Sequence, residues 1–171
     1  MKLSVKIKRL NESVEIPKYA KPGDAGFDLV AAEDVVIKPG ETTVIPTGLA
    51  FEIPSGYEMQ IRPRSGMSRK TKLRVVLGTI DSGYRGEVGV IADNVSMVEY
   101  ASMPRFNAGI LAGDNDFSIT KPVKYEVIEI RKGDRIAQGV ISPVVTAYFE
   151  EVDELSASDR GVGGFGSTGV K

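Results

Sequence analysis

Short runs of alternating apolar and polar residues, separated by turn-forming residues, occupy most of this chain. The first ten residues place Leu3, Val5 and Ile7 between polar neighbours, which is typical of a half-buried strand rather than of a signal peptide. Turn formers between residues 33 and 58 then mark short strands at the spacing of a sandwich or barrel, namely Pro39-Gly40, Pro46, Pro54 and Ser55-Gly56. Because no long helical period occurs, the pattern predicts an all-β domain.

Two further segments have the pattern of paired strands. Residues 75–91 read VVLGTIDSGYRGEVGVI, two β-rich runs around a polar centre, and predict a hairpin. Residues 124–145 alternate on both sides of the turn Lys132-Gly133-Asp134 and predict a second strand pair.

The polar centre of the first segment carries its chemistry at the bend. Asp81 and Tyr84 lie three residues apart, and glycines at positions 78, 83 and 86 let a flat ligand approach the main chain closely. A plain hairpin with a solvated turn is the alternative, and it is commoner in general.

Length, composition and charge narrow the function. The 171 residues suffice for one domain with a single core, and the net charge of −1 does not favour electrostatic binding of nucleic acid. No run reaches the length that crosses a membrane. Cysteine and histidine are absent, so thiolate sites, imidazole ligands and His-based catalysis are excluded. A catalytic base must be a carboxylate, Lys or Tyr, and a metal must be a hard ion such as Mg²⁺.

A local basic stretch breaks this neutrality at residues 60–74, which hold six Lys or Arg residues. Ser65-Gly66 could open a short helix that extends to about Lys72, and a helix start beside Arg64 would present amides to a phosphate. A solvated basic face is the competing interpretation.

Two isolated polar residues also admit two interpretations. Asp28, between Phe27 and Leu29, is either the outward residue of a strand edge or part of a site. Gln138 lies among apolar residues, so its amide is either satisfied internally or exposed to a ligand.

The final twelve residues read RGVGGFGSTGVK. They match GxGxxG formally, but too few residues follow for the helix which a dinucleotide fold needs, and Ser167 stands where a P-loop needs Lys. We expect a mobile Gly-rich arm with one aromatic residue, Phe165, although a flexible tail without function is the commoner case for a chain terminus. Residues 150–159 before it read as an exposed linker, and residues 96–123 form a long irregular excursion.

The combination of these segments resembles the homotrimeric dUTPase family (deoxyuridine triphosphate nucleotidohydrolases). The matching motifs, in order, are AGFDL at 25–29, RPRSG at 62–66, GTIDSGYRGE at 78–87, GDRIAQ at 133–138 and RGVGGFGSTG at 160–169.

The resemblance implies a distorted jelly roll over residues 1–159, a homotrimer, and an arm at 160–171 that closes a neighbouring active site. It implies that Asp81 deprotonates the water that attacks the α-phosphorus of dUTP, that Tyr84 packs under the deoxyribose, and that Asp28 holds Mg²⁺ through water. Phe165 would stack on uracil. The other implied substrate-binding residues are Arg64, Ser65, Gly66, Leu77, Gly78, Thr79, Ile80, Gln138, Arg160, Gly166, Ser167 and Thr168.

The excursion at 96–123 resembles the extra segment of some bacteriophage members, notably those of staphylococcal phages, and this would imply a second role in binding a phage-related repressor. Two alternatives stay open: a dCTP deaminase-like enzyme of the same fold, and a protein whose main role is regulatory interaction. We expect a cytoplasmic protein that binds neither membrane nor, directly, nucleic acid.

Overall fold

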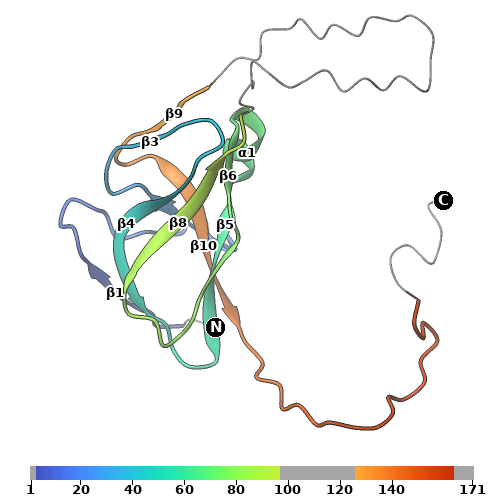
Figure 1. Ribbon diagram of the computed structural model, residues 1–171. Coiled ribbons are helices and arrows are strands. Elements are labelled where there is room, and N and C mark those ends of the chain that lie inside the picture. Colours follow the sequence, from blue (N-terminus) through green and yellow to red (C-terminus); the bar gives the residue numbers. More distant parts are fainter. Residues whose placement is uncertain (1–2, 97–125, 164–171) are drawn as a thin grey trace, which may run out of the picture.

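The computed structural model describes residues 3–96 and 126–163 (Figure 1). Its elements are β1 (Lys6–Arg9), β2 (Phe27–Val30), β3 (Val35–Ile37), β4 (Thr42–Glu52), β5 (Tyr57–Pro63), α1 (Ser65–Lys70), β6 (Leu73–Val75), β7 (Gly78–Ile80), β8 (Glu87–Asn94), β9 (Ile128–Ile130) and β10 (Arg135–Pro143). Strands therefore dominate the described residues, as the sequence predicts, and the one helix among them has six residues. No helix in the described ranges is long and apolar enough to cross a membrane.

Two four-stranded antiparallel sheets enclose the core. The first has the order β1-β4-β8-β6 and the second β2-β10-β5-β7, while β3 pairs with β9 in a small third sheet. Strand β8 illustrates why the chain folds this way, because its residues alternate between buried and outward positions along its full length. The alternate residues Val88, Val90 and Ala92 are fully buried and pack in the core with residues from the second sheet, such as Met59 and Ile61.

The segment predicted to be a single hairpin instead divides between the two sheets. Strand β6 pairs with β8, with Val75 opposite Ala92, as in a hairpin. The chain then crosses over, and β7 pairs with β5 of the other sheet, with Ile80 opposite Met59. The exposed Leu77 marks the crossing, where the alternation of buried and exposed residues is interrupted. The bend that carries Asp81 and Tyr84 therefore connects the two sheets.

The predicted pairing of the strands around Lys132-Gly133-Asp134 is also wrong in its partners. The turn forms, with Gly133 at φ +87°, but β9 pairs with β3 and β10 pairs with β2 and β5. A local pattern defines a strand without defining its neighbour. Pro46 does not end a strand either, because β4 continues past it through a register shift between Pro46 and Ala50.

The predicted helix forms but is shorter than expected. It ends at Lys70 rather than at about Lys72, and Arg64 occupies its N-cap without a side-chain hydrogen bond, so Ser65 is the first helical residue rather than the cap. Thr71 follows, and its hydroxyl donates to Met67 O at 2.8 Å. The expected exposed linker at 150–159 lies within residues 144–163, which are almost entirely exposed and contain no helix or strand.

Asn94 forms hydrogen bonds to residues on both sides of the segment 97–125. Its buried Nδ2 donates to Ile37 O at 2.9 Å and to Glu126 O at 2.7 Å, and its Oδ1 accepts from Ser96 N at 3.0 Å. These bonds hold the end of β8, the end of β3 and the approach to β9 together. We call Asn94, Ser96 and Glu126 the closure cluster.

Replacement of Asn94 with Ala should destabilise the protein by about 2–4 kcal/mol, because it leaves buried carbonyl and amide groups without partners. Urea unfolding at fixed protein concentration measures this. Asp93→Asn is the matched control, because that outward carboxylate accepts from Thr42 Oγ1 at 2.7 Å and an amide oxygen can do the same. Equal stability of the two variants would show that the closure cluster contributes little.

Candidate active site

Asp28 and Gln138 lie side by side on neighbouring strands of the second sheet. Asp28 on β2 is opposite Gln138 on β10, which in turn is opposite Arg62 on β5. Arg64, just beyond β5, places Nε 2.8 Å from Asp28 Oδ1, and Arg135 places Nη1 3.5 Å from Asp28 Oδ2. Arg64 Nη1 also donates to Arg135 O at 3.1 Å. We call Asp28, Arg64, Arg135 and Gln138 the Asp28 cluster.

The carboxylate of Asp28 is not fully satisfied. Its Oδ1 is buried and has no hydrogen-bond partner among the described residues, although Arg64 Nε lies 2.8 Å away in an ion pair. Asp28 thus lies on the edge strand β2, as one of the two interpretations expects, and its part in a ligand site stays a prediction. It lines a polar hollow of about 240 Å³ together with Lys18, Ala20, Asp24, Ala25, Gly26 and Gln138.

The second group of predicted residues lies at the bend between β7 and β8. Tyr84 N donates to Asp81 O at 3.0 Å, so a single turn carries both residues. Tyr84 Oη donates to Glu87 O at 2.9 Å, and Glu87 Oε1 accepts from Gly48 N on β4 at 2.7 Å. Asp81 is exposed and Tyr84 about half exposed. We call Asp81 and Tyr84 the bend group.

Beside this bend, β7 offers main-chain groups to a ligand. Gly78, Thr79 and Ile80 form the edge strand of the second sheet, and no described strand pairs with the other side of β7. An edge strand presents N–H and C=O groups at the spacing of an extended backbone. Leu77 precedes it with 65% of its surface exposed. The arrangement suits recognition of a flat polar ring by main-chain hydrogen bonds.

Within one chain the Asp28 cluster and the bend group are well separated. In the register of the second sheet, Asp28 lies in the row of Gln138, whereas Asp81 follows Ile80, which shares its row with Met59 and Ile141. Three strand spacings of about 4.8 Å and four residues at about 3.3 Å each place Asp81 roughly 20 Å from Asp28. The structure therefore does not unite them in one chain.

Most residues of the predicted arm lie outside the described residues, including Phe165, Gly166, Ser167 and Thr168. Arg160 is described and is exposed, with Nε donating to Gly163 O at 2.9 Å. Figure 1 shows residues 144–163, coloured orange to red, running away from the sheets. Among the described residues, Arg160 forms no hydrogen bond or ion pair with the Asp28 cluster or the bend group.

The remaining two predicted phosphate ligands, Ser65 and Gly66, are the first residues of α1. Both are exposed, and a Cβ at Gly66 would meet nothing within 4 Å. The start of the helix is therefore exposed next to Arg64, and its binding of phosphate stays a prediction. The basic stretch is therefore partly engaged, through the Arg64 ion pair, and partly a solvated face.

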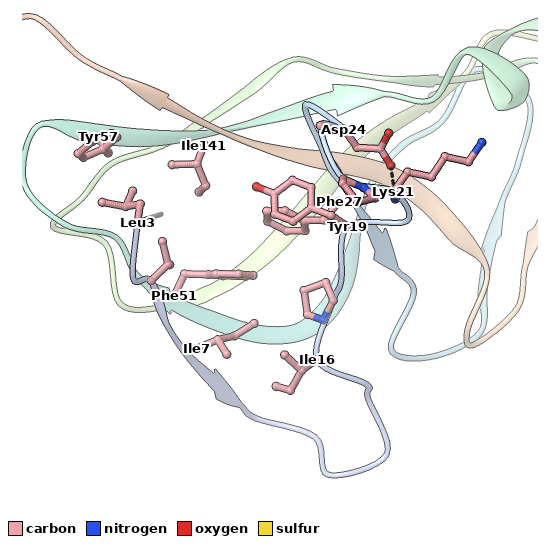
Figure 2. Close-up of a pocket in the computed structure, with 14 residues that line it drawn as sticks. Leu3, Ile7, Ile16, Tyr19, Lys21, Asp24, Phe27, Phe51, Tyr57 and Ile141 are labelled. Carbon is pink, nitrogen blue, oxygen red and sulfur yellow. Dashed lines mark hydrogen bonds between the residues drawn. The ribbon is translucent and has the colours of Figure 1, made fainter. Parts of the chain in front are cut away.

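A larger hollow lies elsewhere and is mainly apolar. It has a volume of about 790 Å³ and contains none of the predicted substrate-binding residues. Figure 2 shows it between β1 and the loop that carries Tyr19, with the rings of Tyr19, Phe27 and Phe51 on its wall. The Tyr19 and Phe27 rings meet edge to face at a centroid distance of 5.6 Å. We call this hollow the apolar groove.

Sequence reasoning missed the apolar groove and the role of Arg135. The groove brings together residues of β1, the 16–24 loop and several other strands, and no single local pattern identifies that set. Arg135 comes three residues before Gln138 on the same strand, but the register shift between Arg135 and Ala137 determines how close it lies to Asp28.

Carboxylates outside these groups serve the framework. Lys6 on β1 is opposite Glu52 on β4 and bonds it at 2.8 Å, which lowers the pKa of Glu52, with a smaller contribution from Arg85. Within residues 3–96 and 126–163, no cluster of three or more acidic side chains could hold a metal ion by itself.

Comparison with known proteins gives a consistent result. The family model described as dUTPase matches residues 12–106 and 113–169. A curated relative from Nautilia profundicola, named deoxyuridine 5'-triphosphate nucleotidohydrolase, is 48% identical over 98% of this chain and 99% of its own length. A relative of the same name from Thermobifida fusca is 47% identical over 96% of this chain and 78% of its own length.

Solved structures agree. The dUTPase of Staphylococcus bacteriophage 80alpha with dUPNHPP has a TM-score of 0.78 at 33% identity, covering 98% of this chain and 99% of that one. The dUTPase of phage phi11 of S. aureus, described as showing a species-specific insert, has a TM-score of 0.72 at 31% identity, covering 91% of this chain and 100% of that one. A mutant of the phi11 protein is described with a structural Mg(II) ion.

Proposed function

This chain belongs to the dUTPase family and hydrolyses dUTP to dUMP and pyrophosphate, and we propose that Asp81 is the base that activates the attacking water. The supporting observation is that one turn carries Asp81 and Tyr84 directly beside the free edge of β7. In this proposal, Asp81 takes a proton from water, the water oxygen bonds to the α-phosphorus, and the bond from that phosphorus to pyrophosphate breaks. The chain has no histidine, and the carboxylate of Asp81 is the base available at this bend.

The base and sugar are recognised at the same bend. Main-chain groups from Leu77 to Ile80 bind the uracil edge, and Tyr84 packs against the deoxyribose where a 2′-hydroxyl would collide. Cytosine presents a donor where uracil presents an acceptor, so it would leave buried polar groups unpaired. Such mismatches discriminate more strongly than a steric wall against the methyl group of thymine.

The phosphates of dUTP bind at the Asp28 cluster. Arg64 supplies a planar cation, Ser65 and Gly66 supply a hydroxyl and amides at the open start of α1, and Gln138 supplies its side-chain amide. Arg160, Gly166, Ser167 and Thr168 close over the phosphates and Phe165 stacks on uracil, so that the arm excludes water during the reaction.

Asp28 suits a magnesium ion held through water. The buried Oδ1, which has no hydrogen-bond partner among the described residues, belongs to a residue that lines the polar hollow, and a lone carboxylate fits an ion whose other ligands are water and phosphate oxygens. When bound, Mg²⁺ would offset the negative charge that develops on the departing pyrophosphate. Asp28 would orient the water ligands of the ion.

The working unit in this proposal is a homotrimer whose sites combine residues of different chains. Support comes from the separation of roughly 20 Å between Asp28, in the Asp28 cluster, and Asp81, in the bend group, as estimated from strand spacing. The apolar side chains of the segment after β10 are almost fully exposed, as at Val145, Tyr148 and Phe149, and the apolar groove could receive them from a second copy.

Replacement of Asp81 with Asn should lower kcat by about 10²–10⁴-fold, the usual contribution of a general base. Binding of a non-hydrolysable dUTP analogue should persist, because the amide has the shape of the carboxylate. Pyrophosphate release and calorimetric titration measure the two. Asp34→Asn is the control, because Asp34 Oδ1 accepts from the distant Lys132 N at 2.7 Å and an amide can replace it. Near-normal turnover of the Asp81 variant would defeat the proposal.

A mixing experiment tests the shared site. Chains with Arg64→Ala and chains with Asp81→Asn are each expected to be almost inactive, but when co-assembled they should regain about a quarter of wild-type activity, since one ordered pair of neighbours in four restores a complete site.

Wild-type chains co-assembled with the double variant Arg64→Ala/Asp81→Asn provide the reference. Sites that combine two chains retain about a quarter of the activity, whereas sites within one chain retain about half. Activity near half in this reference, with none in the first mixture, would exclude a shared site.

We also propose that the segment between the closure cluster residues is separable from hydrolysis and binds a regulatory protein such as a repressor. The predicted excursion at 96–123 lies, except for Ser96, outside the described residues. The family match is interrupted only at residues 107–112, so most of the excursion has counterparts in relatives. The phage 80alpha protein is described as controlling transfer of virulence genes by a G protein-like mechanism.

Replacement of residues 98–124 with a short Gly-Ser linker should preserve dUTP hydrolysis within about twofold, because Ser96 Oγ already lies 3.4 Å from Glu126 O and the closure cluster holds both ends. Retention of a repressor on a column of wild-type protein, and its loss with the shortened chain, would support separate roles. Loss of hydrolysis together with binding would contradict them.

A further inference from the structure

Gly86 lies directly against the ring of Tyr84. A Cβ atom built on Gly86 would be 2.7 Å from Tyr84 Cζ and 3.1 Å from Cε2, and closer still to the hydroxyl. Real Cβ atoms do not approach carbon this closely, so the ring and a side chain at position 86 cannot share this space. The absence of a side chain at Gly86 therefore allows the observed position of Tyr84.

Three hydrogen bonds hold Tyr84 and the neighbouring Glu87 in place. Tyr84 Oη donates to Glu87 O at 2.9 Å, and Tyr84 N donates to Asp81 O at 3.0 Å. Glu87 is itself held to β4, because its carboxylate accepts from Gly48 N at 2.7 Å. The ring thus lies over bare backbone and is tied at its hydroxyl to a residue that the sheet holds in place.

The other glycine of the bend differs. A Cβ on Gly83 would meet nothing within 4 Å, and neither Gly83 nor Gly86 has a φ angle in the left-handed region. An alanine is therefore compatible with the backbone at both positions, and the two differ in what the added methyl group would touch. Gly83 is consequently a matched control for Gly86.

We propose that Gly86 is a specificity-determining positioning residue, which holds the Tyr84 ring where it rejects the 2′-hydroxyl of a ribonucleotide. This inference rests on the proposed contact of Tyr84 with deoxyribose. A methyl group at position 86 pushes the ring away, and since Tyr84 is about half exposed, the ring can move toward solvent without disturbing the core. The Tyr84 ring then no longer fills the space that a 2′-hydroxyl would need.

The test is Gly86→Ala, with kcat/KM measured for dUTP and for UTP. The ratio of the two should fall by about tenfold or more, the size of effect expected when a steric exclusion is removed. A partly unfolded preparation lowers both values equally and leaves the ratio unchanged, so the ratio reports position rather than stability. The unfolding midpoint should stay at the wild-type value.

Gly83→Ala should leave the ratio unchanged. Tyr84→Ala should lower the ratio at least as far as Gly86→Ala, and adding Gly86→Ala to Tyr84→Ala should change the ratio no further, because the glycine acts through the ring.

The outcomes separate the two claims. If Tyr84→Ala leaves the ratio intact, the proposed sugar contact of Tyr84 is wrong. If Tyr84→Ala lowers the ratio and Gly86→Ala does not, the contact stands and the role of Gly86 is overturned. A Gly86→Ala protein that unfolds also overturns the inference, since a ring free to move would leave the fold intact.

Discussion

The passage of the chain from one sheet to the other at residues 76–78 is the constraint on which the site depends. Strand β6 is paired with β8 through Val75, and three residues later β7 is paired with β5. Both pairings are antiparallel. Val75 of β6 is buried in the core and the partly buried Ile80 of β7 packs against it, so a shift at either end of the crossing would expose apolar surface. The bend is therefore anchored on two sides, which suits a turn that must hold a carboxylate and an aromatic ring in fixed relation.

Much of the secondary structure follows from the alternation of residues, whereas the pairing does not. The strands around Lys132-Gly133-Asp134 were predictable from their pattern, but their partners β3 and β2 lie near the other end of the chain, and no local signal specifies them. The position of Pro46 inside β4 depends on a register shift, which includes Gly48 at φ +67°. Such features arise from tertiary packing and escape a residue-by-residue reading.

The candidate site shows the same division. Asp81 and Tyr84 could be placed together from sequence, because three residues separate them at a bend. The proximity of Asp28 to Arg64 could not, because it arises from the alignment of β2, β10 and β5. The sequence motifs identified the candidate residues. The sheet register shows in addition that they lie in two separate groups within a single chain. On the proposed mechanism, that division makes assembly part of the chemistry rather than an accessory to it.

The closure cluster has a consequence for how such a protein can change in length. Asn94 donates to Glu126 O at 2.7 Å and so joins the two ends of a long connection at its base. Once the ends are joined, the entropy lost in closing the connection rises only with the logarithm of its length, by about 0.6 kcal/mol for each doubling. Residues can therefore be gained or lost there over generations at little thermodynamic expense, while the sheets that carry catalysis remain unaltered.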